Sequence, residues 1–363
     1  MKVAIVHYWL NGMRGGEKVL ESLCRLYPQA DIYTHVYEPE KVSDLINSHT
    51  VHTSFISKLP FGKKKYQSYL PFMPIALEQL DLTGYDLVIS SESGPAKGVI
   101  TNPEAVHVCY CHSPMRYVWD MYYEYFKGAG KLKRLIAAPL IHYLKMWDYS
   151  TGARVDHFIA NSSYIAKRIE KIYRRDAEVI NPPVEFDAFS ISEDVDDYYL
   201  VLGQMVQYKR VDLAVEAFIA NGKKLVIVGD GEKADELREM AKGHSNIDIR
   251  GRQPFSEIVR LYSGCQALIF PGVEDFGIVP LEAMASGRPV IAYGRGGVLD
   301  SVVDGKTGIY FNEQTAESLN QAVAAYEAGQ YDFKPEALRA HAMSFATSEF
   351  EKKLKAYIDS VMP

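Results

Sequence analysis

The chain has 363 residues and is close to charge balance, with 40 basic and 46 acidic side chains. This length exceeds what one hydrophobic core usually fills, so two domains are expected, and the charge balance argues against a general nucleic-acid-binding surface. The first ten residues are apolar but end at Asn11-Gly12, too early for a signal-peptide core or a membrane span. The cysteines form neither Cys-x-x-Cys pairs nor a cluster with histidine, so neither a zinc site nor a disulfide framework is predicted. A cytoplasmic protein with reduced thiols fits; the thiols are Cys24, Cys109, Cys111 and Cys265.

Short apolar runs along the chain predict buried strands. In the first half they cover residues 2–9, 31–37, 86–91, 106–112 and 157–161, separated by long and less regular insertions. In the second half they cover residues 198–205, 224–229, 247–251, 267–271, 289–293 and 308–311, and they alternate with helical patterns such as 211–220. Alternation of this kind is typical of parallel sheets. An α/β fold with two Rossmann-like, doubly wound domains is therefore predicted.

The boundary between the two predicted domains is marked by proline. Asn181-Pro-Pro-Val184 can neither continue a helix nor donate hydrogen bonds in a central strand. We expect one domain from 1 to 181 and a second from 182 to 345. A C-terminal amphipathic helix, 346–363, is expected to pack back on the first domain.

Two segments of the first half are basic, aromatic and free of acidic residues. They span residues 55–77 and 125–147. Segments of this composition suit contact with anionic lipid headgroups, but they are too charged to cross a bilayer. A solvated protein surface is the alternative interpretation. Their basic residues include Lys58, Lys63, Lys64, Lys65, Lys127, Lys131, Lys133, Arg134 and Lys145.

The strongest local pattern runs from Phe270 to Val290, where a strand leads through a loop into a helix. Glu274 lies on the loop and Glu282 in the first predicted helical turn. Both are at the carboxyl edge of a parallel sheet, where open α/β folds bind ligands, and carboxylates there suit sugar and ribose hydroxyls. The free amides at the helix start can face an anion; they belong to Phe276, Gly277, Ile278 and Val279. Two glutamates eight residues apart would mean little without the surrounding glycine and proline frame.

Three further loops follow predicted strands. Lys209-Arg210 precedes a helix and can neutralise a leaving diphosphate, although such a pair is usually only solvent-exposed. Gly15-Gly16 opens a helix whose amides could meet a phosphate, although a double glycine alone is simply a turn. His112 stands at a strand end, a place where a lone histidine is more often structural than catalytic.

Two other enzyme classes find little support. Gly229-Asp-Gly231 lacks the third glycine of a dinucleotide fingerprint and does not follow the first strand of its domain, which argues against an oxidoreductase. The sequence contains no Gly-x-x-x-x-Gly-Lys-Ser/Thr loop, which argues against a P-loop kinase.

Together these motifs resemble the retaining glycosyltransferases of family 4, and the resemblance spans essentially the whole chain. It implies the GT-B fold, in which two Rossmann-like domains face each other across a cleft. It further implies that Glu274 binds donor-hexose hydroxyls, Glu282 the ribose and Lys209 the diphosphate. His112 is expected to face the donor sugar near the reacting centre, with Gly15 and Gly16 beside the phosphates. Many members have arginine at the position of Gln204; Arg210 is expected to supply that charge, and this variant resembles bacterial O-antigen and exopolysaccharide mannosyltransferases.

The expected activity is therefore retaining transfer of a hexose, with mannose from GDP-mannose as the first choice. The acceptor is expected to be a lipid-diphosphate-linked saccharide of bacterial cell-surface polysaccharide synthesis, at the inner face of the cytoplasmic membrane. The nucleotide sugar is a substrate, and neither a cofactor nor an essential metal is expected. A nucleotide-sugar epimerase of the same fold and a non-catalytic sugar-nucleotide-binding subunit remain alternatives.

Overall fold

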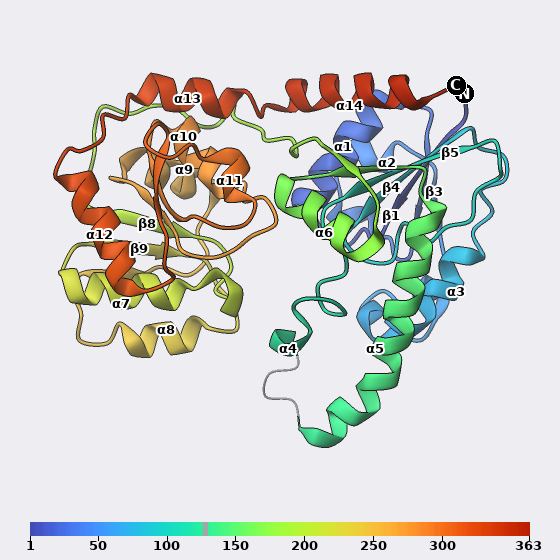
Figure 1. Cartoon of the computed structure of the whole chain (residues 1–363), viewed down its shortest axis with the longest axis horizontal. Coiled ribbons are helices and arrows are strands. Elements are labelled where there is room, and N and C mark those ends of the chain that lie inside the picture. The colour runs from blue at the N-terminus through green and yellow to red at the C-terminus, as the bar shows by residue number, and fades with distance from the viewer. Residues whose placement is uncertain (126–129) are drawn as a thin grey trace. The chain divides into compact units, whose positions relative to one another are not determined.

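The computed structural model describes residues 1–125 and 130–363, and it divides the chain into two compact units. The N-terminal domain comprises Met1–Pro183 together with Thr347–Pro363, and the C-terminal domain comprises Val184–Ala346. Each is built on its own parallel sheet flanked by helices (Figure 1). The predicted fold class of two Rossmann-like domains is thus confirmed. Lys127 of the second basic segment lies outside the described residues.

The N-terminal sheet has seven parallel strands in the order β3-β2-β1-β4-β5-β6-β7. The five predicted strands are all present, and two edge strands of three residues each, β3 and β7, were not predicted because so short a run carries no readable apolar pattern. Their bounds are β1 Val3–His7, β2 Asp31–Thr34, β3 Val51–Thr53, β4 Leu87–Glu92, β5 Val106–Cys111, β6 His157–Ala160 and β7 Ala177–Val179.

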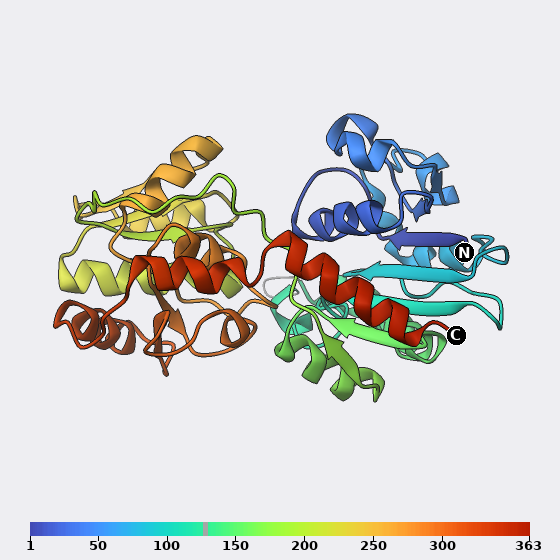
Figure 2. The same cartoon turned by 90° about the horizontal axis from the view of Figure 1, so that it is seen from above.

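The helices of the N-terminal domain include the chain's C-terminal segment. The last helix, α14, packs on the first, α1, through an Arg25–Glu351 ion pair of 2.6 Å, and its apolar face, with Leu354 and Ile358, enters the core of this sheet. Figure 2 shows α14, in red, lying over this domain. The helices are α1 Gly15–Leu26, α2 Asp44–Asn47, α3 Met73–Glu78, α4 Tyr122–Tyr125, α5 Lys131–Thr151, α6 Ser163–Tyr173 and α14 Thr347–Val361.

The C-terminal sheet has six parallel strands in the order β10-β9-β8-β11-β12-β13. All six were predicted, because the central strands are apolar runs buried on both faces and the edge strand β10 still alternates isoleucine with Asp248. The strands are β8 Tyr199–Leu202, β9 Leu225–Val228, β10 Ile247–Ile249, β11 Leu268–Phe270, β12 Val290–Tyr293 and β13 Gly308–Phe311. The helices are α7 Val211–Asn221, α8 Ala234–Met240, α9 Phe255–Gly264, α10 Val279–Ala285, α11 Val298–Ser301, α12 Ala316–Glu327 and α13 Pro335–Met343.

Each sheet reverses its direction of growth once. In the C-terminal domain β9 and β10 extend from one side of β8, and β11 returns to its other side; in the N-terminal domain β1 and β4 flank the corresponding point. The loops after the two central strands diverge at such a switch point and leave a crevice at the carboxyl edge of the sheet. This topology therefore marks one candidate binding position in each domain.

A buried ion cluster fixes the irregular part of the N-terminal domain. Lys97, Glu92 and Asp148 are all fully buried, and the Lys97 ammonium forms an ion pair with Asp148 and lies 3.6 Å from Glu92 Oε1. The second carboxylate oxygen of Asp148 accepts hydrogen bonds from Trp119 Nε1, at 2.7 Å, and the Tyr173 hydroxyl, at 2.8 Å. The cluster therefore ties the end of β4, the loop that follows it, α5 and α6 to one another.

Burial dominates the ionisation of this cluster. It raises the pKa of Glu92 to about 7, and the Asp148 charge adds to this, while the Lys97 ammonium and two backbone N–H donors oppose it. Removing the cation from this cluster would leave two carboxylates buried without a compensating charge, which destabilises the folded state.

Replacing Lys97 by methionine should destabilise the protein by about 3–5 kcal/mol, because Asp148 and Glu92 would stay buried without their cation. Denaturant unfolding of the purified protein measures this change. The matched control is Lys355→Met, which removes an ion pair with Asp359 that is exposed on α14 and should cost about 0–1 kcal/mol. Equal effects of the two substitutions would contradict the structural role of the cluster.

Candidate functional site

The C-terminal switch point brings together the loops that follow β8 and β11. The β8 loop carries Lys209 and the β11 loop carries Glu274, and the Lys209 ammonium lies 2.8 Å from Glu274 Oε1. The two side chains are 16% and 19% exposed, so the pair is largely shielded from solvent but still accessible. An ion pair in such surroundings is screened little by salt.

Two glycines allow these loops to approach so closely. A Cβ on Gly272 would lie 2.6 Å from the Cα of Lys209, and a Cβ on Gly297 would lie 2.1 Å from the carbonyl oxygen of Asp275. The Gly297 N–H also donates a 2.8 Å hydrogen bond to the carbonyl of Glu274. The backbones of both charged residues are therefore held by contacts that only glycine permits.

Glu282 adds a second carboxylate next to the pair. It lies in the first turn of α10, half-buried, and its Oε2 accepts a 2.6 Å hydrogen bond from the Tyr262 hydroxyl. Burial raises the pKa of Glu282, against the opposing effects of the Tyr262 hydrogen bond and the Lys209 charge. Tyr262 was not predicted as a site residue, because on the sequence it belongs to the apolar face of α9. Only the fold shows that its hydroxyl reaches Glu282.

The other predicted site residues of the C-terminal domain have different structural positions. Arg210 is the N-cap of α7 with φ of 50°, and its Nε donates to both carboxylate oxygens of Asp212, at 3.0 and 3.1 Å. Gln204 is exposed in the same loop. Phe276 is buried in the core, and Gly277, with φ of +89°, turns the chain into α10. Ile278 and Val279 are half-buried at the start of that helix.

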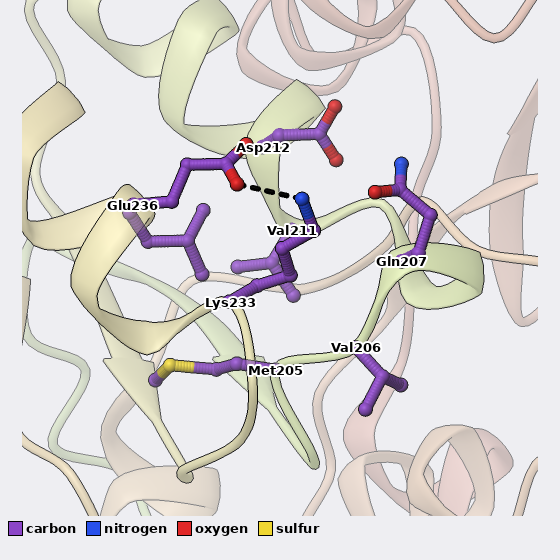
Figure 3. A pocket seen from close by; sticks show the side chains of 8 residues that line it. Met205, Val206, Gln207, Val211, Asp212, Lys233 and Glu236 are labelled. Atoms are coloured by element: carbon purple, nitrogen blue, oxygen red, sulfur yellow. Dashed lines mark hydrogen bonds and ion pairs between the residues drawn. The ribbon is translucent and has the colours of Figure 1, made fainter. Parts of the chain in front are cut away.

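A small pocket adjoins the Lys209 loop between the starts of α7 and α8 (Figure 3). None of the predicted site residues lines it. A Lys233–Glu236 ion pair of 2.6 Å spans its α8 wall. The pocket is lined by Met205, Val206, Gln207, Val211, Asp212, Lys233, Glu236 and Leu237.

In the N-terminal domain the Gly15-Gly16 loop follows β1 and opens α1. A Cβ on Gly16 would lie 2.3 Å from the Tyr8 hydroxyl, so a larger residue does not fit here. The next residue, Glu17, is buried 3.6 Å from His7 Nε2 and accepts a 2.9 Å hydrogen bond from the Arg14 N–H. Burial acts to raise the pKa of Glu17, but the interaction with His7 and the backbone hydrogen bonds hold it below its usual value.

His112 directly follows β5, at the same edge of this sheet. Its Nε2 is 2.8 Å from the Ser91 hydroxyl, and burial, together with the nearby His7, lowers its pKa to about 3. The imidazole is therefore neutral at ordinary pH, and it can exchange hydrogen bonds with hydroxyl groups rather than supply a positive charge. His7 was not singled out from the sequence, where it stands inside an apolar run; a buried polar residue at a strand end was the available signal.

The structure thus assembles the predicted residues in two groups. Lys209, Glu274 and Glu282 meet at the switch point of the C-terminal sheet, whereas Gly15, Gly16 and His112 lie at the corresponding edge of the N-terminal sheet. In the described residues no three His, Cys, Asp or Glu side chains gather as a metal site would require. None of the helices in the described part of the chain is long and apolar enough to span a membrane.

Substituting Gly272 by alanine should lower the free energy of unfolding by about 1–3 kcal/mol, because its Cβ would meet backbone atoms of Tyr208 and Lys209 that cannot rotate away. Thermal or denaturant unfolding tests this. Gly84→Ala is the matched control, because a Cβ there meets nothing within 4 Å and neither glycine has a positive φ. Equal stability of the two variants would show that the close approach of the loops does not matter.

The imidazole of His112 should show no titration step near 6.5, its ordinary pKa. Because the pKa is lowered in the folded state, the unfolded chain binds this proton more tightly; the contribution to stability is present above pH 6.5 and is lost as the pH falls toward 3. NMR of the histidine-labelled protein measures the step, with His112→Gln to assign the signal. Protonation near pH 6.5 would refute the neutral imidazole.

Both halves of the chain resemble known glycosyltransferases in sequence. The model for glycosyl transferases group 1 matches residues 185–343, and the model for Glycosyltransferase Family 4 matches residues 13–188. Over 288 residues the chain is 27% identical to alpha-1,3/1,6-mannosyltransferase ALG2 of Dictyostelium discoideum, with 65% of this chain and 66% of that one covered.

A glycogen synthase of Pseudomonas syringae is 26% identical over 221 residues, which cover 59% of this chain and 43% of the synthase, so the chain spans under half of that relative's length. Among solved structures, Anabaena HepE in complex with UDP-glucose superposes with a TM-score of 0.71 at 17% identity, covering 99% of this chain and all of the other. The two glycosyltransferase family models thus match successive parts of this chain, and the solved structure shares its two-domain fold.

Proposed function

We propose that the protein is a retaining hexosyltransferase whose nucleotide-diphosphate sugar binds at the switch point of the C-terminal sheet. The observation that carries this proposal is the Lys209–Glu274 pair, with Glu282 next to it, held by glycine-lined loops. Lys209 is the cation for the diphosphate, Glu274 the acceptor for hexose hydroxyls and Glu282 the acceptor for the ribose. When a diphosphate binds the Lys209 ammonium, the Glu274 carboxylate loses its partner and can accept hydrogen bonds from the sugar hydroxyls.

Catalysis then rests on stabilising the leaving group. As the glycosidic bond breaks, the sugar becomes oxocarbenium-like and negative charge grows on the β-phosphate, where a fixed cation stabilises it. Glu274 is engaged with Lys209 and is assigned no nucleophilic role. We therefore favour front-face transfer with retention, in which the leaving phosphate accepts the proton of the acceptor hydroxyl and no metal is essential. The neutral His112 is proposed to hydrogen-bond to the transferred sugar.

For the donor we propose GDP-mannose. The support is the similarity to a mannosyltransferase over 65% of the chain, while a solved structure of the same fold holds UDP-glucose and makes UDP sugars the donors to compare. The acceptor is proposed to be a lipid-diphosphate-linked saccharide of bacterial cell-surface polysaccharide synthesis. The enzyme would then work in the cytoplasm, at the inner face of the membrane.

Purified protein should release nucleoside diphosphate from GDP-mannose when a lipid-diphosphate saccharide is supplied, and Lys209→Ala should lower kcat by about 100- to 1,000-fold, because the leaving phosphate loses its cation. Glu274→Ala should abolish transfer while nucleotide binding, followed by calorimetry, persists. Coupled detection of released diphosphate measures the rate, and EDTA should leave it unchanged.

The matched control is Glu317→Ala, which removes an exposed carboxylate from α12 of the same domain and should retain full activity. Parallel reactions with UDP-glucose and UDP-N-acetylglucosamine identify the nucleotide. Release of altered sugar without an acceptor would favour an epimerase, and wild-type activity in Lys209→Ala would refute the assignment of the site.

A further inference from the structure

Helix α5 presents two apolar faces, and only one of them is used by the fold. Ile141, Leu144 and Trp147 are buried in the core of the N-terminal domain. A second stripe stays in solvent at spacings that place its members on one side of the helix. We call it the outer stripe of α5, and its members are all exposed: Leu132, Leu135, Ile136, Tyr143 and Met146.

A second exposed apolar group sits on a tight loop of the same domain. Phe61 is 71% exposed, although its backbone has a φ of 56°, a conformation that a bulky residue rarely adopts. The turn is tight because a Cβ on the following Gly62 would lie 2.2 Å from the carbonyl oxygen of Ile56, and the N–H groups of Lys64 and Lys65 donate to the Phe61 carbonyl. The fold thus holds a phenyl ring out in the water at the expense of backbone strain.

Four lysines lie in the same stretch of chain as this ring. Lys58, Lys63, Lys64 and Lys65 are all exposed, and the Lys65 ammonium lies 5.5 Å from the centroid of the Phe61 ring. Residues 55–77 contain no acidic side chain, while the whole chain has a net charge of −6. Positive charge is therefore concentrated locally around an exposed apolar residue, which we call the Phe61 loop, residues 58–65.

The two features belong to neighbouring elements. Glu78, at the end of α3, accepts a 3.2 Å hydrogen bond from Trp147 of α5 and pairs with Arg154 at 2.7 Å. Figure 1 shows α3 beside α5. Between the loop and the end of α3, Phe72 and Ile75 add further exposed apolar surface, at 51% and 48%.

We propose that the Phe61 loop and the outer stripe of α5 together form a docking surface for an anionic lipid bilayer. Lysines flanking exposed aliphatic and aromatic side chains match the negative headgroups and the acyl boundary of such a membrane, and lysine stems can extend along the apolar region while their ammonium groups stay at the phosphates. If this surface instead bound a second copy of the chain, that copy would need a compact acidic patch opposite the four lysines. The proposal rests on this surface alone and is independent of the donor site.

Sedimentation with vesicles tests the proposal on the whole chain. Wild-type protein should bind phosphatidylcholine vesicles that contain phosphatidylglycerol and not vesicles of phosphatidylcholine alone, and salt should weaken the binding. Lys63→Gln/Lys64→Gln should lower the partition coefficient by about five-fold per lysine. Leu135→Ser/Ile136→Ser and Phe61→Ser should each lower it by about ten-fold or more, because they remove apolar groups that enter the bilayer.

Controls of the same chemistry separate this surface from general effects. Lys352→Gln/Lys353→Gln removes two exposed lysines from α14, and Leu299→Ser removes a 50% exposed leucine from α11; both should bind vesicles like the wild type. Circular dichroism and thermal unfolding confirm that each variant is folded. Binding that needs no anionic lipid, or that survives all three docking variants, overturns the proposal. So does a wild-type dimer in light scattering that the same variants dissociate, because the surface would then join two copies.

Discussion

The strands of a parallel sheet all end on one edge of that sheet, and this constraint determines where the candidate site of this protein lies. In both domains the strand order reverses once, so the loops after two central strands diverge and leave room at the carboxyl edge. Lys209 and Glu274 follow β8 and β11, the two strands that flank the reversal in the C-terminal sheet. A different strand order would separate these residues, whatever their sequence.

The two ion pairs that matter most differ in their access to solvent. Lys97 and Asp148 are fully buried with Glu92, and their hydrogen bonds run only to other parts of the N-terminal domain. Lys209 and Glu274 form the same kind of pair but keep 16% and 19% of their surfaces exposed. The first pair is suited to hold elements together, because no ligand can replace its partners. The second is open enough to exchange partners with the nucleotide sugar that we propose as its ligand.

The buried pair also explains how α5 can expose so much apolar surface. Asp148, near the C-terminal end of α5, is fixed by Lys97, Trp119 and Tyr173, and Ile141 and Leu144 pack into the core. These contacts anchor the helix along one face and leave the outer stripe outside the core. An exposed apolar stripe lowers the solubility of a protein unless a partner covers it. A binding partner for the outer stripe therefore explains why the stripe is apolar.

Much of the architecture can be predicted from local sequence patterns. Apolar runs bounded by glycine and proline predicted the central strands of both sheets, since strands buried on both faces must be continuously apolar; the edge strands β3 and β7 are too short for such a pattern. The frame around Glu274 and Glu282 indicated a ligand site for the same reason, because strand, loop and helix start are each encoded within a few residues. The sequence by itself thus determined the two-domain α/β class and the candidate loops. Only the tertiary structure decided that Lys209 pairs with Glu274, that Arg210 pairs with Asp212, that Tyr262 reaches Glu282 and that His7 lies 3.6 Å from Glu17. These contacts depend on strand order, on loop conformation and on side-chain direction.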